Sequence, residues 1–295
     1  MILSQIFLMT LLLGPIVWGS RNWFTYKGTS LSNNSSLGNT MINSAVLYAL
    51  AFNIIFFIQE LFLVLGKKAL GLEALLYHNN HNWVGEHQMT SLMQGSGALA
   101  IFLTGLICLA VFHFIRNSRS IWKLLILWLA FHGLVQSIPQ VMIASLKPET
   151  DVGEALVGYL KLSESTLIIL AAICMVSVAL ICSWFSKLLL EFNAEEVDFS
   201  NPKDKFRYIR HIAVGAAVIG SIFVIPFRIF PWSQAMTPFI VFVFSIPWTW
   251  SAAAVSKPVR RNMSKVNEKI YWSPIVCLVL LLIFFRLVLA PGVTF

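Results

Sequence analysis

The stretch Ser165–Leu189 reads STLIILAAICMVSVALICSWFSKLL, an apolar run in which Lys187 is the single charged residue. A helix needs about 20 mostly apolar residues to cross the hydrocarbon core of a bilayer, because each residue advances it by about 1.5 Å. The run is much longer than a typical strand, and it lacks the turn residues that would divide it. This stretch therefore predicts a transmembrane helix.

Similar runs recur along the chain, and we expect about eight spans in an all-α, polytopic transmembrane helical bundle. Their predicted bounds are Ile2–Trp18, Ile42–Leu65, Leu92–Ile115, Ile121–Leu146, Ser165–Leu189, Ile209–Phe230, Pro238–Val255 and Ile270–Leu289. The connections between them are at most about 20 residues long, so residues 1–295 are expected to form a single integral membrane domain. The first run ends in small residues that a signal peptidase accepts, but no basic residue precedes it, and we favour a retained helix.

The composition agrees with a membrane location. Of the 295 residues, 58% are hydrophobic and 12% are charged, whereas a soluble domain carries about 25% charged residues. The net charge of +8 does not indicate nucleic-acid binding here, because basic residues also gather in cytoplasmic loops and beside anionic headgroups. Membrane lipids are the expected partners, with other membrane proteins as further candidates.

The basic residues predict the orientation. The odd-numbered loops hold about fifteen of them and the even-numbered loops about five, so the odd loops are expected to be cytoplasmic. The odd-loop residues are Arg21, Lys27, Arg116, Arg119, Lys123, Lys187, Lys203, Lys205, Arg207, Arg210, Lys257, Arg260, Arg261, Lys265 and Lys269. Both termini and the even loops then lie outside, and we expect a bacterial inner membrane.

The second loop contains half of the six histidines, within Tyr77–His87 (YHNNHNWVGEH). Three neutral imidazoles with an open position make a catalytic zinc site, so His78, His81 and His87 are candidate ligands of a divalent metal such as zinc or iron, with Glu86 or His132 as alternatives to His87. A helical conformation would bring His78 and His81 to one face. The alternative is a polar interfacial loop without a metal, since the spacing matches no established metal motif.

Polar residues also recur inside the fourth predicted span. His132, Gln136 and Gln140 follow one another every four residues, which places them on one helical face. Polar side chains at membrane depth are costly, so they usually face the bundle interior. In the second span Glu60 lies in the outer third, where it needs a proton, a cation or a charged partner. We therefore take Glu60, His132, Gln136 and Gln140 as candidate catalytic residues.

Three further residues fall in the same outer layer under this topology. They are Gln94, Arg228 and Arg286, which are candidate substrate-binding residues. Either arginine could instead form a structural ion pair with Glu60. The convergence of these groups predicts one polar cavity that opens to the outside.

Parts of the first half resemble segments of an uncharacterised family of bacterial polytopic integral membrane proteins. The resemblance is carried by Ala51–Asn53, Gln59–Leu63, His78–Trp83 and Phe131–Gln140, and it implies no activity. The HExxH motif of site-2-type zinc proteases is absent. Prenyl-protein-type proteases carry paired glutamates, which the Gln59-Glu60 pair matches only in part. Membrane desaturases need several HxxH-type boxes, and only His78–His81 could serve as one.

Three functional hypotheses remain open. The first is a metal-dependent hydrolase or transferase that acts on a lipid or lipid-linked substrate. The metal would activate water, and Glu60 would serve as general base or would orient a metal ligand. Arg228 and Arg286 would hold a phosphate or carboxylate of the substrate. The second is a non-enzymatic subunit that binds a partner, a quinone or a haem, for which His132 and His113 are candidate ligands. The third is a small-solute transporter, which predicts symmetry between the two halves of the chain.

Overall fold

The computed structural model describes residues 2–25, 35–115, 117–118, 120–192, 202–228, 235–257, 266 and 269–295. Within them, seven helical segments are long and apolar enough to cross a membrane, which makes the chain an integral membrane protein. They are Leu37–Ala69, Thr90–Phe114, Trp122–Ala144, Glu164–Leu190, Pro202–Val224, Thr237–Ala254 and Trp272–Leu289. The all-α bundle expected from the apolar runs is therefore confirmed.

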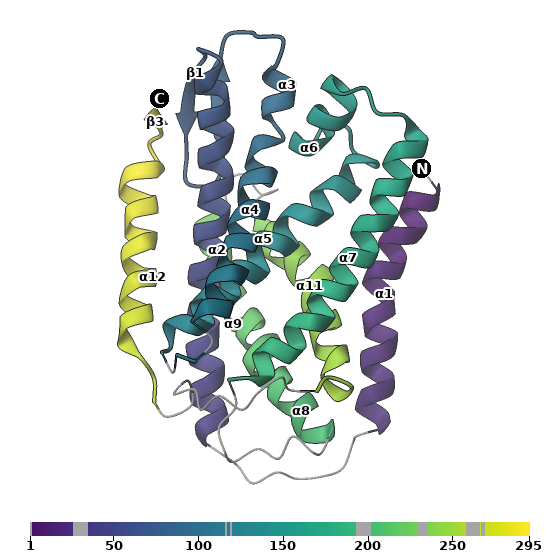
Figure 1. Ribbon diagram of the computed structural model, residues 1–295. Helices are drawn as coiled ribbons and strands as arrows, with labels where there is room; N and C mark the ends of the chain where they lie inside the picture. The colour runs from purple at the N-terminus through teal and green to yellow at the C-terminus, as the bar shows by residue number, and fades with distance from the viewer. Residues whose placement is uncertain are drawn as a thin grey trace.

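The run predicted at residues 2–18 forms helix α1 (Ile2–Thr25), although α1 is not among those seven segments. It lies lengthwise beside α7 (Glu164–Leu190) and contacts α11 (Thr237–Ser251) (Figure 1). The Nε1 atom of Trp248 donates to the backbone oxygen of Leu11 at 2.9 Å, which ties α1 to the bundle.

Helix α2 (Ser35–Ala69) is the central element. It packs against α4 (Ser96–Phe114), α5 (Trp122–Ala144), α9 (Ala216–Val224) and α12 (Trp272–Phe284), and α12 stands on the side of α2 that is remote from α1 (Figure 1). At 35 residues, α2 is about 52 Å long and extends beyond the hydrocarbon core. One end of it therefore reaches the polar loops that form the candidate site.

Aromatic residues of α2 and α5 build the core. Tyr48, Phe52, Trp128 and Phe131 are fully buried. The indole of Trp128 also donates to Ser44 Oγ at 3.0 Å, which satisfies its single polar atom inside the bundle. These contacts hold the polar face of α5 at a defined rotation against α2.

The remaining helical elements are short. They comprise α3 (Thr90–Met93), α6 (Asp151–Gly153) with the π-helical turns Glu154–Tyr159, α8 (Pro202–Ile209) with the π-helical turns Arg210–Gly215, the 3-10 turns Ile225–Arg228 and Ala252–Ala254, and the π-helical turns Phe285–Leu289. Thr150 begins α6 by accepting a hydrogen bond from the backbone N–H of Gly153, at 3.3 Å.

A three-stranded antiparallel sheet covers the end of α2, with the strand order β2-β1-β3. Strand β1 (Glu73–Leu76) pairs with β2 (His81–Val84) as a hairpin, with Leu76 opposite His81. Strand β3 (Val293–Thr294) pairs with the other edge of β1. The His-rich loop is thus a hairpin and not a helix, so His78 and His81 do not share a helical face.

Both ends of the chain lie at the hairpin end of the bundle, as the alternation of spans and loops predicts (Figure 1). Which side of the membrane this end faces stays a prediction. Several residues behind that prediction lie outside the described part of the chain, namely Lys27, Arg116, Arg119, Arg260, Arg261 and Lys265.

Candidate active site at the hairpin end

The centre of the site is a contact between the hairpin and α2. The Nδ1 atom of His81 lies 2.8 Å from Oε2 of Glu60. Residues 81 and 83 point to the same side of β2 because side chains alternate along a strand, and this side faces α2. Glu60 is 3% exposed, so its carboxylate is paired where water has little access.

The other ring nitrogen of His81 identifies its protonation state. Its Nε2 atom lies 3.3 Å from Oε1 of Gln94, and the same oxygen accepts a hydrogen bond from Lys67 Nζ at 3.0 Å. An ammonium group only donates, so the amide of Gln94 must turn its oxygen toward Lys67. Nε2 of His81 must then donate as well. With Glu60 accepting at Nδ1, both ring nitrogens of His81 donate, which is the hydrogen-bonding pattern of an imidazolium.

The pKa of His81 agrees with this assignment. Burial disfavours the imidazolium, but the hydrogen bond from His81 to Glu60 and the negative charge of that carboxylate outweigh burial. The pKa of His81 is therefore raised above its ordinary value of 6.5. Asp151 adds a smaller contribution in the same direction.

Trp83 completes the inner face of the hairpin. Its ring stacks on His81 with the ring centroids 5.9 Å apart and the planes 15° from parallel. Lys67 Nζ lies 4.7 Å from the Trp83 ring centroid and 3.2 Å from the backbone oxygen of Thr90. The aromatic face and the backbone oxygen together hold the buried amino group of Lys67, which no carboxylate of the described residues contacts directly.

A cavity of about 220 Å³ adjoins this cluster. Its polar lining comes from Gln59 and Glu60 of α2, Gln136 and Gln140 of α5, Asp151 of α6 and Thr237 of α11. Its apolar lining comes from other positions on α2 and α5 and from α11. The cavity thus offers a polar wall and an apolar wall, as an amphiphilic ligand requires.

The glutamines of this cavity are held in place by each other. Gln140 Nε2 donates to Gln59 Oε1 at 3.0 Å and lies 2.8 Å from the backbone oxygen of Gln136. Because both contacts use the amide hydrogens of Gln140, the amide oxygen of that residue stays available to a ligand.

Asp151 places a second carboxyl group on the same cavity. Burial raises the pKa of Asp151 above its ordinary value of 3.8. The positive charges of His81 and Lys67 oppose this shift, whereas the negative charges of Glu60 and Glu154 add to it. One cavity is therefore lined by the carboxyl group of Glu60, which contacts His81, and by the carboxyl group of Asp151, whose pKa is raised.

His132 occupies a more enclosed position than the cavity. It is fully buried, and its Nδ1 atom lies 3.2 Å from Nε2 of Gln136. The rings of Tyr48 and Phe52 lie 4.4 and 5.3 Å from the imidazole, centroid to centroid. The predicted stripe of His132, Gln136 and Gln140 does face the interior, but only the two glutamines line the cavity.

The candidate metal ligands are not gathered together. His87 is exposed, and its Nδ1 atom accepts the backbone N–H of Met89 at 3.1 Å. His78 lies in the hairpin turn, and His81 uses both ring nitrogens as donors. In the described part of the chain, no three His, Cys, Asp or Glu side chains come close enough to hold a metal ion. The residues present do not fit a zinc or iron centre, and the metal stays a prediction without structural support.

The candidate substrate-binding residues have three different environments. Gln94 is 4% exposed and serves to bridge Lys67 and His81. Arg228 is 2% exposed and lies over the Phe56 ring, 3.5 Å from its centroid. Arg286 is exposed on the π-helical turns that follow α12, and His113, the second candidate haem ligand, is exposed on α4. Neither arginine lines the cavity beside Glu60.

Three residues of the site were not singled out from the sequence, namely Gln59, Lys67 and Asp151. Lys67 counted only as a loop charge, although its position at the end of a span places it beside the next polar loop. Gln59 adjoins Glu60 in the chain, and Asp151 belongs to a short acidic connection, Glu149-Thr150-Asp151. No local pattern marks the last two as cavity residues, because the cavity forms between elements distant in sequence.

Comparison of the chain with protein family models, with curated proteins and with solved structures found no match. The resemblance carried by the first half of the sequence therefore stays a prediction.

Proposed function

We propose that the chain is a membrane enzyme that performs acid–base hydrolysis or group transfer on a lipid or lipid-linked substrate. The observation that carries the proposal is the pair of carboxyl groups, Glu60 and Asp151, on one cavity with a polar and an apolar wall. Two carboxyl groups in different surroundings on one cavity are a common arrangement for paired base and acid catalysis.

In this proposal Glu60 is the general base. Its carboxylate, which is held in place by His81, takes a proton from water or from a substrate hydroxyl as that oxygen attacks the scissile bond. Asp151 is the general acid and gives its proton to the departing oxygen. The reaction leaves Glu60 protonated and Asp151 ionised, and exchange with water restores both groups. No step passes through a metal ion.

The apolar wall of the cavity supports an amphiphilic substrate. Phe56, Ile240 and Phe244 contribute to its apolar lining, and α2 and α11, which carry them, belong to candidate spans. We assign the hairpin end to the non-cytoplasmic side of the membrane, because the basic residues concentrate in the odd-numbered loops. The site then acts on the outer leaflet, in a bacterial inner membrane.

The test uses purified protein in vesicles made from a total bacterial lipid extract, with products identified by mass spectrometry. Turnover should fall about 100-fold or more in Glu60→Gln and in Asp151→Asn, since general acid–base groups contribute about 10²–10⁴-fold. Glu149→Gln is the matched control, because Glu149 is an exposed carboxylate two residues from Asp151. Full activity in both site variants would refute the acid–base roles.

A folded wild-type protein without turnover would instead favour the non-enzymatic subunit. In that case the cavity binds its ligand without converting it. Tight binding of an extracted lipid or quinone that depends on Gln136 and Gln140 would identify this alternative.

A further inference from the structure

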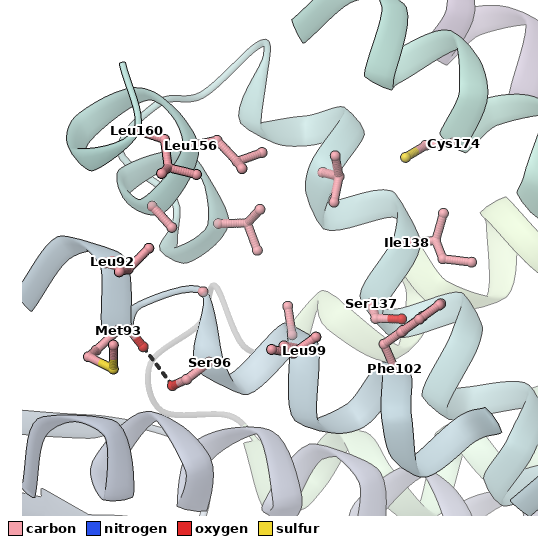
Figure 2. Close-up of a pocket in the computed structure, with 15 residues that line it drawn as sticks. Leu92, Met93, Ser96, Leu99, Phe102, Ser137, Ile138, Leu156, Leu160 and Cys174 are labelled. Carbon is pink, nitrogen blue, oxygen red and sulfur yellow. Dashed lines mark hydrogen bonds between the residues drawn. The ribbon is translucent and has the colours of Figure 1, made fainter. Parts of the chain in front are cut away.

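A second and larger cavity lies on another side of α5. Its volume is about 530 Å³, within the range of about 300–1,000 Å³ that is typical of small-molecule sites. Leu92 and Leu160 lie toward one side of it and Cys174 toward the other (Figure 2). Ser137 and Ile138 of α5 line this cavity, whereas Gln136 and Pro139 line the first one. The two cavities are therefore separated by α5.

The lining of this second cavity, as formed by the described residues, is almost entirely apolar. No charged side chain contributes to it, and its two hydroxyl groups already have acceptors. Ser96 Oγ lies 2.6 Å from the backbone oxygen of Met93, and Ser137 Oγ lies 2.7 Å from that of Gly133 (Figure 2 shows the former). A polar headgroup would lose its hydration and gain few hydrogen bonds in return, so the lining favours an apolar chain.

The position of the cavity identifies the source of that chain. Helices α4, α5 and α7, which surround it, all belong to candidate spans. Leu99 and Leu160 line the cavity and are 59% and 50% exposed, so the cavity reaches the outer surface of the bundle. In a membrane that surface is covered by lipid tails, and an open apolar cavity there is filled from the bilayer.

We propose that this cavity binds one acyl chain of a bilayer phospholipid, as a site distinct from the polar cavity beside Glu60. The proposal does not rest on acid–base catalysis. A chain held between α4, α5 and α7 would also support the π-helical turns Glu154–Tyr159, whose Leu156 lines the cavity and which directly follow α6, the helix that carries Asp151. Bound lipid would in this way stabilise the segment that carries one carboxyl group of the polar cavity.

The experiment uses the full chain in phosphatidylcholine–phosphatidylglycerol vesicles that contain a phospholipid with a photoreactive acyl chain. After irradiation, crosslinked positions are mapped by peptide mass spectrometry. We expect crosslinks at cavity positions such as Leu99, Ile138 and Val141, and also on the lipid-facing side of α12, where Val276 and Val279 are exposed. Cavity crosslinks should persist when the protein is washed in detergent before irradiation, whereas the α12 crosslinks should be lost, because only the cavity retains its chain.

Two variants that fill the cavity provide the second arm. Ala98→Trp on α4 and Val141→Phe on α5 add bulk to the lining, and Ala110→Trp adds the same bulk to an exposed position of α4 outside it. Cavity crosslinks should fall to background in both filling variants and remain in Ala110→Trp, with α12 labelling in unwashed samples unchanged throughout. The proposal would be overturned if washing removed the cavity crosslinks of the wild type together with those of α12. It would also be overturned if the cavity crosslinks survived in a folded filling variant.

Discussion

The Nδ1 atom of His81 lies 2.8 Å from Oε2 of Glu60, and this contact joins strand β2 of the hairpin to the central helix α2. Gln94 accepts from Lys67 and lies beside the second ring nitrogen of His81, and the pKa of His81 is raised, so we assign the contact as an ion pair. The hairpin is thus attached to the bundle by a charged group whose protonation depends on pH.

The ion pair should appear as an energetic coupling between the two residues. Glu60→Gln and His81→Gln should each lower the free energy of unfolding in detergent. The double variant should lose less than the sum of the two, by about 1.5–3 kcal/mol, the typical strength of a hydrogen bond to a charged group. Denaturant titration of the four proteins measures this coupling, and strictly additive losses would show that the pair does not form.

The same pair predicts a pH dependence of stability. A histidine whose pKa is raised in the folded state stabilises the protein fully below its unfolded pKa, near 6.5, and this stabilisation is lost as the pH rises through the folded pKa. The melting temperature of the wild type should therefore exceed that of His81→Gln at about pH 6 and approach it at higher pH. His87→Gln is the control, because His87 is exposed. An advantage that is constant with pH would contradict the assignment of His81 as an imidazolium.

The contact between α4 and α5 depends on two glycines. A Cβ atom on Gly133 would lie 2.6 Å from Gly105 Cα and 2.7 Å from the backbone oxygen of Ile101, which no side-chain rotation relieves. Gly133→Ala should therefore destabilise the protein by about 1–3 kcal/mol, the usual cost of overpacking. Gly38→Ala is the matched control, since nothing lies within 4 Å of its added Cβ. In thermal unfolding, Gly38→Ala should leave the melting temperature unchanged or raise it slightly. Equal losses of stability in Gly133→Ala and Gly38→Ala would disprove the close approach of α4 and α5 at Gly105 and Gly133.

Chelation tests the metal expectation. Both nitrogens of His81 donate hydrogen bonds, which leaves no lone pair for a metal ion, so removal of divalent metals should not lower the melting temperature. Metal content is measured on detergent-purified protein beside a His78→Ala/His81→Ala double variant. About one equivalent of zinc or iron, lost in that variant, would instead establish the metal site predicted from the sequence.

The sequence by itself determined the class of the fold. Long apolar runs such as Ser165–Leu189 form helices in lipid because each backbone group must find its partner within the same segment, which makes span formation a local property. The four-residue spacing of His132, Gln136 and Gln140 is equally local, and it correctly indicated a polar face turned toward the bundle interior.

Only the tertiary structure decided which of these polar groups meet. Strand β1 pairs with β2 on one edge and with β3 on the other. The pairing of β1 with β3 joins residues more than 200 positions apart and leaves no periodic signal in the sequence. The hairpin, in place of a helix, brings His81 and not His78 to Glu60, and it directs the second ring nitrogen to Gln94. Asp151 joins the cavity because α6 packs over the end of α5, a contact set by side-chain packing between elements and not by the order of residues within either one.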